Sequence, residues 1–241
     1  MSQNGSGPEL RSAADAGGPE PAFNAPWPAL LLTVGLVALY AWQASVPDQV
    51  ALAYRLGLIP VDPAPRAFMS HIFVHGGWGH VLVNALGALA FGSGVCRLFG
   101  TRALGAAAFF VFFLVCALLG GLGYVLVKPD SVVPVIGASG GVSGLMGAAS
   151  RVLDRRFAVR RDGGRLASFT SPTVVSMALA VLILNLMFAV LGFAPGMGEG
   201  AIAWEAHLVG YAAGLLLIGP AAWLLGRSAG PPARGGAREF H

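Results

Sequence analysis

Six apolar stretches follow one another along this chain, and each is about as long as a membrane-spanning helix. They cover residues 28–46, 78–96, 103–127, 137–153, 172–193 and 202–226. About 20 mainly apolar residues are needed to cross roughly 30 Å of hydrocarbon. Because lipid offers the backbone no hydrogen-bond partners, stretches of this kind fold as helices. We therefore predict an all-α membrane protein in which six transmembrane helices form a bundle.

The composition also favours a membrane protein that lies in a lipid bilayer. Hydrophobic residues make up 56% of the chain and charged residues only 11%, and the mean hydropathy is +0.71. A soluble domain has about a quarter of its residues charged. A net charge of +4 could suggest a nucleic-acid partner. Most arginines flank apolar stretches, however, where such residues orient a protein in the bilayer, and we therefore expect no nucleic-acid partner. Cys96 and Cys116 lie inside apolar stretches without metal-site spacing, and we expect no cofactor.

The chain divides into three predicted parts. Residues 1–27 are rich in Gly, Pro, Ala and Ser and should form a flexible cytoplasmic tail, with no signal peptide. Residues 28–226 form the membrane domain, and residues 227–241 form a second flexible cytoplasmic tail. Within the membrane domain, prolines and glycines interrupt residues 47–77, which we expect to be a long first outer loop with short helices.

Basic residues indicate how the helices cross the membrane. If the N-terminus is cytoplasmic, the outer segments hold only Arg55, Arg66 and Lys128, and the remaining 12 of the 15 basic residues are inside. Cytoplasmic loops carry such an excess of Lys and Arg, so both termini are predicted to be cytoplasmic. Arginine outnumbers lysine, and Ala and Gly are abundant, which favours a bacterial source and therefore the inner (cell) membrane.

A serine among very small residues opens the fourth stretch. Ser139 lies between Gly137-Ala138 and Gly140-Gly141, which leave room for the backbone of a substrate. A Gly-x-Ser-x-Gly match is also typical of the nucleophile elbow in soluble hydrolases, but that turn follows a β-strand, which this chain does not supply. We expect Ser139 to be a nucleophile at the outer end of a membrane helix.

A histidine opens the sixth stretch one turn before a Gly-x-x-x-Gly pattern. His207 is followed by Gly210 and Gly214, so this helix can approach another closely. In the fourth stretch, Gly140, Gly144 and Gly147 recur near helical spacing and would let these two helices pack backbone to backbone. Ser139 should then attack a peptide carbonyl while His207 takes its proton and returns it to the leaving amine. Glu205, two residues away, points to another helix face, and we predict a dyad without an acid.

Four further polar residues lie in or near the outer half of the second stretch: His71, His75, His80 and Asn84. His80 and Asn84 are four residues apart and therefore share a helix face. Together with the backbone N–H of Ser139, they are candidates for donors to a developing oxyanion. His71 and His75 precede Gly76-Gly77, and we expect both to be structural residues of the first outer loop.

This combination resembles the rhomboid family of intramembrane serine proteases over about residues 56–219. The motifs are Gly137-Ala-Ser139-Gly140, His75-Gly-Gly-Trp-x-His80-x-x-x-Asn84 and Ala206-His207-x-x-Gly210-x-x-x-Gly214. The resemblance implies a rhomboid-like bundle, with Ser139 as nucleophile, His207 as base, and His80 and Asn84 as oxyanion stabilisers.

The resemblance also implies what such a protein acts on and how a substrate enters. Its substrates would be single-span membrane proteins cleaved near the outer face, admitted past a movable fifth helix, with residues 194–200 as a flexible cap. Two positions depart from the family pattern. Pro65-Arg66 replaces a Trp-Arg pair that many relatives have nearby, and Ser143 replaces an aromatic ring that some relatives place against the histidine.

Two other functional classes remain open at this stage. Clustered histidines within spans can ligate a metal or haem, or line a proton path in a transporter, although no carboxylate or thiolate accompanies this cluster. A catalytically silent relative that only binds membrane proteins is the second class, and intact Ser139 and His207 argue against it.

Asn185 is a polar residue within the fifth stretch. A residue of this kind most often forms a hydrogen bond with a neighbouring helix, and we expect no more of Asn185.

Overall fold

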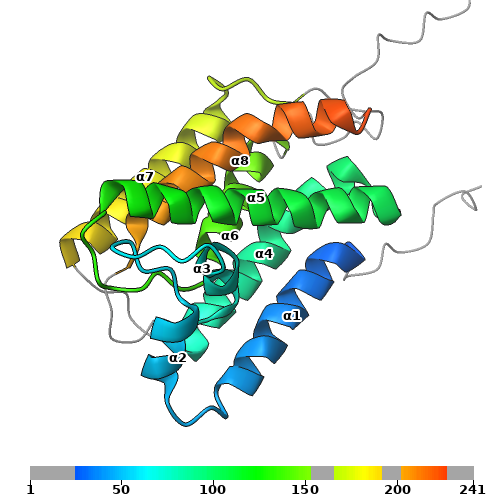
Figure 1. The fold of residues 1–241 in the computed structure, drawn as a ribbon. Helices are drawn as coiled ribbons and strands as arrows, with labels where there is room; N and C mark the ends of the chain where they lie inside the picture. Colours follow the sequence, from blue (N-terminus) through cyan, green and yellow to red (C-terminus); the bar gives the residue numbers. More distant parts are fainter. Residues whose placement is uncertain (1–24, 153–165, 192–201, 227–241) are drawn as a thin grey trace, which may run out of the picture.

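The computed structural model describes residues 25–152, 166–191 and 202–226, which form a bundle of helices (Figure 1). The helices are α1 Trp27–Gln43, α2 Gln49–Leu56, α3 Ala67–Ser70, the 3-10 helix η2 His71–Phe73, α4 Trp78–Phe99, α5 Ala103–Val127, α6 Ser139–Val152, α7 Pro172–Leu191 and α8 Trp204–Leu224. The described residues include no strand, only an isolated bridge between Leu58 and Val135. Each predicted span matches one of α1, α4, α5, α6, α7 and α8 to within a few residues, so the all-α prediction is confirmed.

The described helices are those of an integral membrane protein. Four of them, α4, α5, α7 and α8, are long and apolar enough to cross a bilayer, and α1 is a shorter apolar helix. The described part of α6 has 14 residues. Nearly all of the predicted tails, the arginine-rich run from Arg155 to Arg165 and the predicted cap at 194–200 lie outside the described residues.

α6 lies in the middle of the bundle and packs against α4, α5, α7 and α8, while α1 and α7 lie on opposite sides of it (Figure 1). Its closest partner is α8, as the glycine spacing predicts. A Cβ atom added to Gly214 would lie 2.7 Å from the Cα of Gly144, and one added to Gly210 would lie 3.1 Å from the Cα of Gly140. The two backbones therefore touch, and no side chain separates them.

The first outer loop contains α2, α3 and η2, which confirms the predicted short helices. It is tied to α1 by the amide of Gln43, which donates to the carbonyl of His75 at 2.7 Å and accepts from the N–H of His75 at 3.0 Å. It is also tied to the segment before α6, because Leu58 and Val135 exchange two backbone hydrogen bonds of 3.0 and 2.9 Å. The first outer loop thus supports the chain that leads into Ser139.

Candidate active site

Ser139 is the first residue of α6, half-buried at the end of the helix that the rest of the bundle surrounds. The two preceding residues are held by the first outer loop. Gly137 donates its N–H to the carbonyl of His71 at 2.8 Å, and Ala138 donates to Nε2 of His75 at 3.4 Å. Gly137 has φ +113°, a conformation that glycine adopts more easily than other residues. These contacts fix the backbone from which the Ser139 hydroxyl projects.

The structure brings Ser139 and His207 together, although they are 68 residues apart in the sequence. Oγ of Ser139 lies 2.9 Å from Nε2 of His207, within the range of a hydrogen bond. His207 is in the first turn of α8, and Gly210 follows one turn later against Gly140. The direct contact of the two backbones is therefore what places the hydroxyl beside the imidazole.

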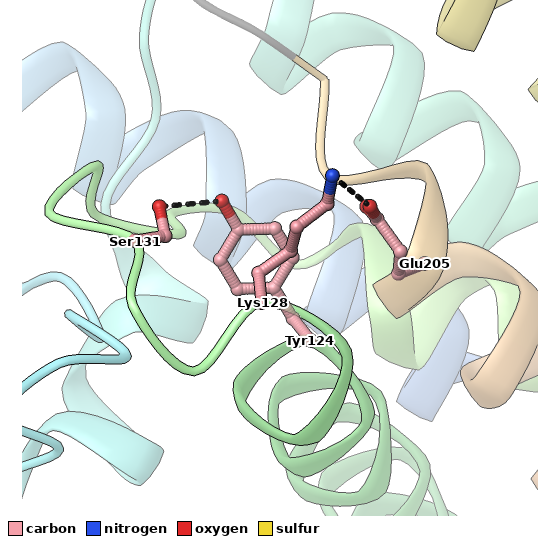
Figure 2. Close-up of polar contacts among 4 residues, drawn as sticks. All are labelled: Tyr124, Lys128, Ser131 and Glu205. Carbon is pink, nitrogen blue, oxygen red and sulfur yellow. Dashed lines mark hydrogen bonds and ion pairs between the residues drawn. The ribbon is translucent and has the colours of Figure 1, made fainter.

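The other nitrogen of His207 contacts Asn185, for which the sequence suggested only a hydrogen bond to a neighbouring helix. Nδ1 lies 2.9 Å from Oδ1 of Asn185, on α7. Glu205, the nearest carboxylate in the sequence, points elsewhere as predicted. Its Oε1 pairs with Nζ of Lys128 at 3.6 Å, across the ends of α5 and α8 (Figure 2). Among the described residues, the histidine thus has an amide on the side away from the serine, and no carboxylate.

His80 reaches the same site from α4. Its Nδ1 accepts a hydrogen bond from the N–H of Gly76 at 3.3 Å, so a neutral ring carries its proton on Nε2. That Nε2 is 2.7 Å from where a Cβ of Gly137 would lie, and the same Cβ would be 3.8 Å from Oγ of Ser139. His80 therefore approaches the serine over a space that only a glycine at 137 leaves open.

Asn84 is buried one turn further along α4, and its amide is turned back onto its own helix. Nδ2 of Asn84 donates to the carbonyl of His80 at 2.9 Å. The structure thus connects Asn84 with His80 and gives it no direct bond to Ser139. An amide nitrogen has two N–H groups, so one of them stays free of this bond.

The remaining two histidines of the cluster have structural contacts. His71 bonds the carbonyl of Ala67 through Nδ1 at 2.9 Å, and His75 packs edge-on against His80 with ring centroids 5.1 Å apart. Burial lowers the pKa of His75 to about 3, and burial also lowers the pKa of His71. Both rings are therefore neutral near pH 7. Among the described residues, no group of three or more His, Cys, Asp or Glu side chains is arranged to hold a metal ion.

The sequence matches the model of a known protein family. The family model of the Rhomboid domain matches residues 64–224, which is more than half of the chain. No curated protein has a sequence that matches this one. The matched region contains Ser139, His207, Asn185 and the second half of the first outer loop. The chain therefore belongs to the rhomboid family of intramembrane serine proteases.

Proposed function

We propose that this protein is an intramembrane serine endopeptidase in which Ser139 is the nucleophile and His207 is the general base. The observation that carries the proposal is the 2.9 Å contact between Oγ of Ser139 and Nε2 of His207. Oγ attacks the carbonyl carbon of a peptide bond as Nε2 accepts its proton. The same proton then passes to the leaving amine, and water releases the acyl group from Ser139 by the reverse sequence.

Stabilisation of the oxyanion is assigned to groups that surround Ser139. The first N–H groups of an α-helix have no acceptor within the helix, which makes the backbone N–H of Ser139 available. Nε2–H of His80 is the second donor, since Nδ1 is occupied by Gly76. Asn84 is the third, through the N–H that it does not donate to His80, and it also holds the backbone of that residue in place.

The substrates that suit this site are single-span membrane proteins. Ser139 lies at the end of a membrane helix, so a peptide bond can reach it from the bilayer or from a short distance above it. The distribution of Arg and Lys supports cytoplasmic termini, with Ser139 and His207 near the outer face. We therefore place cleavage near the outer face of a bacterial inner membrane. The fifth membrane helix, α7, is the candidate for the movable gate.

The test is labelling of the purified protein by a fluorophosphonate, which reacts with an activated serine. We expect labelling of the unmodified protein, none in Ser139→Ala, and nearly none in His207→Ala. Ser143→Ala is the matched control, since it removes a hydroxyl one turn later on the same helix. Labelling that persists in Ser139→Ala would disprove the assignment of the nucleophile. A correctly folded protein that is never labelled would favour a catalytically silent relative.

A further inference from the structure

The amide of Asn185 is held in one orientation beside the candidate base. Nδ2 of Asn185 donates to the carbonyl of Val181 at 2.8 Å, one turn earlier on α7. Exchanging the amide oxygen and nitrogen would set two oxygens against each other at that position. The oxygen of the amide therefore faces Nδ1 of His207, which is 2.9 Å away. An oxygen can only accept here, so the proton of a neutral His207 ring is on Nδ1.

This choice of tautomer is the one that the proposed reaction needs. With its proton on Nδ1, the ring presents a lone pair at Nε2 to the hydroxyl of Ser139 at 2.9 Å. The opposite tautomer would present an N–H to that hydroxyl and could not accept its proton. The three groups thus form a continuous series, from Ser139 through His207 to Asn185, on three different helices.

The burial of Asn185 shows that this contact is specific. α7 is otherwise mostly exposed, and its exposed large residues include Leu182, Ile183 and Leu186. Asn185 is only 3% exposed, on the same face as Val181 and Val174. A polar side chain on a lipid-facing helix is unfavourable unless it finds a partner. Here its carbonyl partner and the histidine satisfy both ends of the amide.

We propose that Asn185 is a positioning residue that holds the base, His207, in the tautomer and orientation needed for catalysis. This inference rests on the proposed function of Ser139 and His207. A carboxylate in this position would also stabilise a protonated ring, but it would place a negative charge among membrane helices. The neutral amide orients the ring without that charge. In the described part of the chain, it takes the place that an acid would hold behind the base.

The decisive experiment compares Asn185→Leu with Asn185→Asp in the full-length protein. Leucine removes the acceptor at similar size, and aspartate keeps an oxygen in the same place. We expect kcat for a transmembrane substrate to fall on the order of 10- to 100-fold in Asn185→Leu, with KM almost unchanged, because only the base is affected. Asn185→Asp should recover a substantial part of that loss. The thermal unfolding temperature should stay close to that of the unmodified protein in Asn185→Leu. It should be lower in Asn185→Asp, because aspartate sets a second oxygen against the carbonyl of Val181 and places a charge among membrane helices.

Val181→Ala is the matched control, since it loosens the same face of α7 and leaves the acceptor in place. We expect it to change kcat much less than Asn185→Leu does. The inference is wrong if Asn185→Leu keeps full kcat, if Val181→Ala reduces kcat equally, or if Asn185→Asp is no better than Asn185→Leu. Ser139→Ala is measured in parallel. Activity that survives in Ser139→Ala would overturn the proposed function itself. If Ser139→Ala is inactive but Asn185→Leu keeps full activity, only the role of Asn185 is overturned.

Discussion

Placing a single methyl group between α6 and α8 should separate the candidate nucleophile from its base. A Cβ atom at Gly210 would lie 2.9 Å from the carbonyl carbon of Gly140 and 3.1 Å from its Cα, and closer still to its oxygen. Carbon atoms in ordinary contact are about 3.5 to 4.0 Å apart. All three contacts are with backbone, which no side-chain rotation can relieve. The two helices must therefore move apart by roughly 0.5 to 1 Å to relieve them.

This movement falls directly on the proposed pair, because Gly140 follows Ser139 and Gly210 lies one turn after His207. Adding the same displacement to a 2.9 Å contact stretches it beyond the usual limits of a hydrogen bond. Misplacement by about 1 Å can cost on the order of 100-fold in rate. Overpacking of this kind costs about 1 to 3 kcal/mol in stability. We expect Gly210→Ala to show both effects.

The assay is the rate of fluorophosphonate labelling in detergent, measured beside the thermal unfolding temperature. Gly35→Ala is the control, because a Cβ atom at Gly35 on α1 would meet nothing within 4 Å. Alanine is also the better helix former, so this variant should label normally and unfold no earlier. If Gly210→Ala is labelled as fast as Gly35→Ala, the close contact of α6 and α8 does not set the catalytic geometry.

Three further predictions concern the surroundings of the site. Gly137→Ala should lower kcat by up to about 100-fold in a peptidase assay. The new methyl carbon would lie 2.7 Å from Nε2 of His80 and push that ring away, and the positive φ of residue 137 would strain the backbone. An unchanged kcat would argue against His80 as a donor. Lys128→Ala should lower the unfolding temperature more than Glu205→Gln does. The Lys128 side chain is 52% exposed and that of Glu205 only 3%, so loss of the lysine leaves a buried carboxylate without its cation. A larger effect of Glu205→Gln would contradict this reasoning. Burial lowers the pKa of His75 from 6.5 to about 3, so between these pH values His75 is protonated in the unfolded chain and neutral in the folded one. Thermal stability should therefore fall as the pH is lowered from 6.5 towards about 3. His75→Phe should show a smaller fall, and an identical dependence on pH would exclude His75 as its source.

Much of the fold and the central pair could be predicted from the sequence, and the reason is physical. The length of an apolar stretch is set by the thickness of the bilayer, so the helices could be placed within a few residues. The pairing of α6 with α8 followed from glycines at Gly140, Gly144, Gly210 and Gly214, since only glycine allows two helix backbones to touch. The positions of the glycines therefore predicted where the two helix backbones meet, and Ser139 lies beside that contact.

The partner of His207 could not be predicted in the same way. α7 is apolar all round, so its sequence does not tell which face is turned towards the other helices. The contact of Asn185 with His207 depends on the rotation and lateral position of that helix. The one signal in the sequence was a lone amide within an apolar run. The direction of the Asn84 amide, which bonds the carbonyl of His80, was likewise hidden, because spacing gives the helix face and not the rotamer.

The start of α6 at Ser139 has a consequence for the water that the proposed hydrolysis consumes. Because the helix begins at Ser139 itself, the backbone immediately before the proposed nucleophile is not helical. In the described part of the chain, the segment just before Ser139 is an irregular loop bonded to residues of the first outer loop. Exposed amides and carbonyls prefer an aqueous setting to lipid tails. Water for the proposed hydrolysis is therefore expected to reach Ser139 along this loop, on the side away from the body of α6.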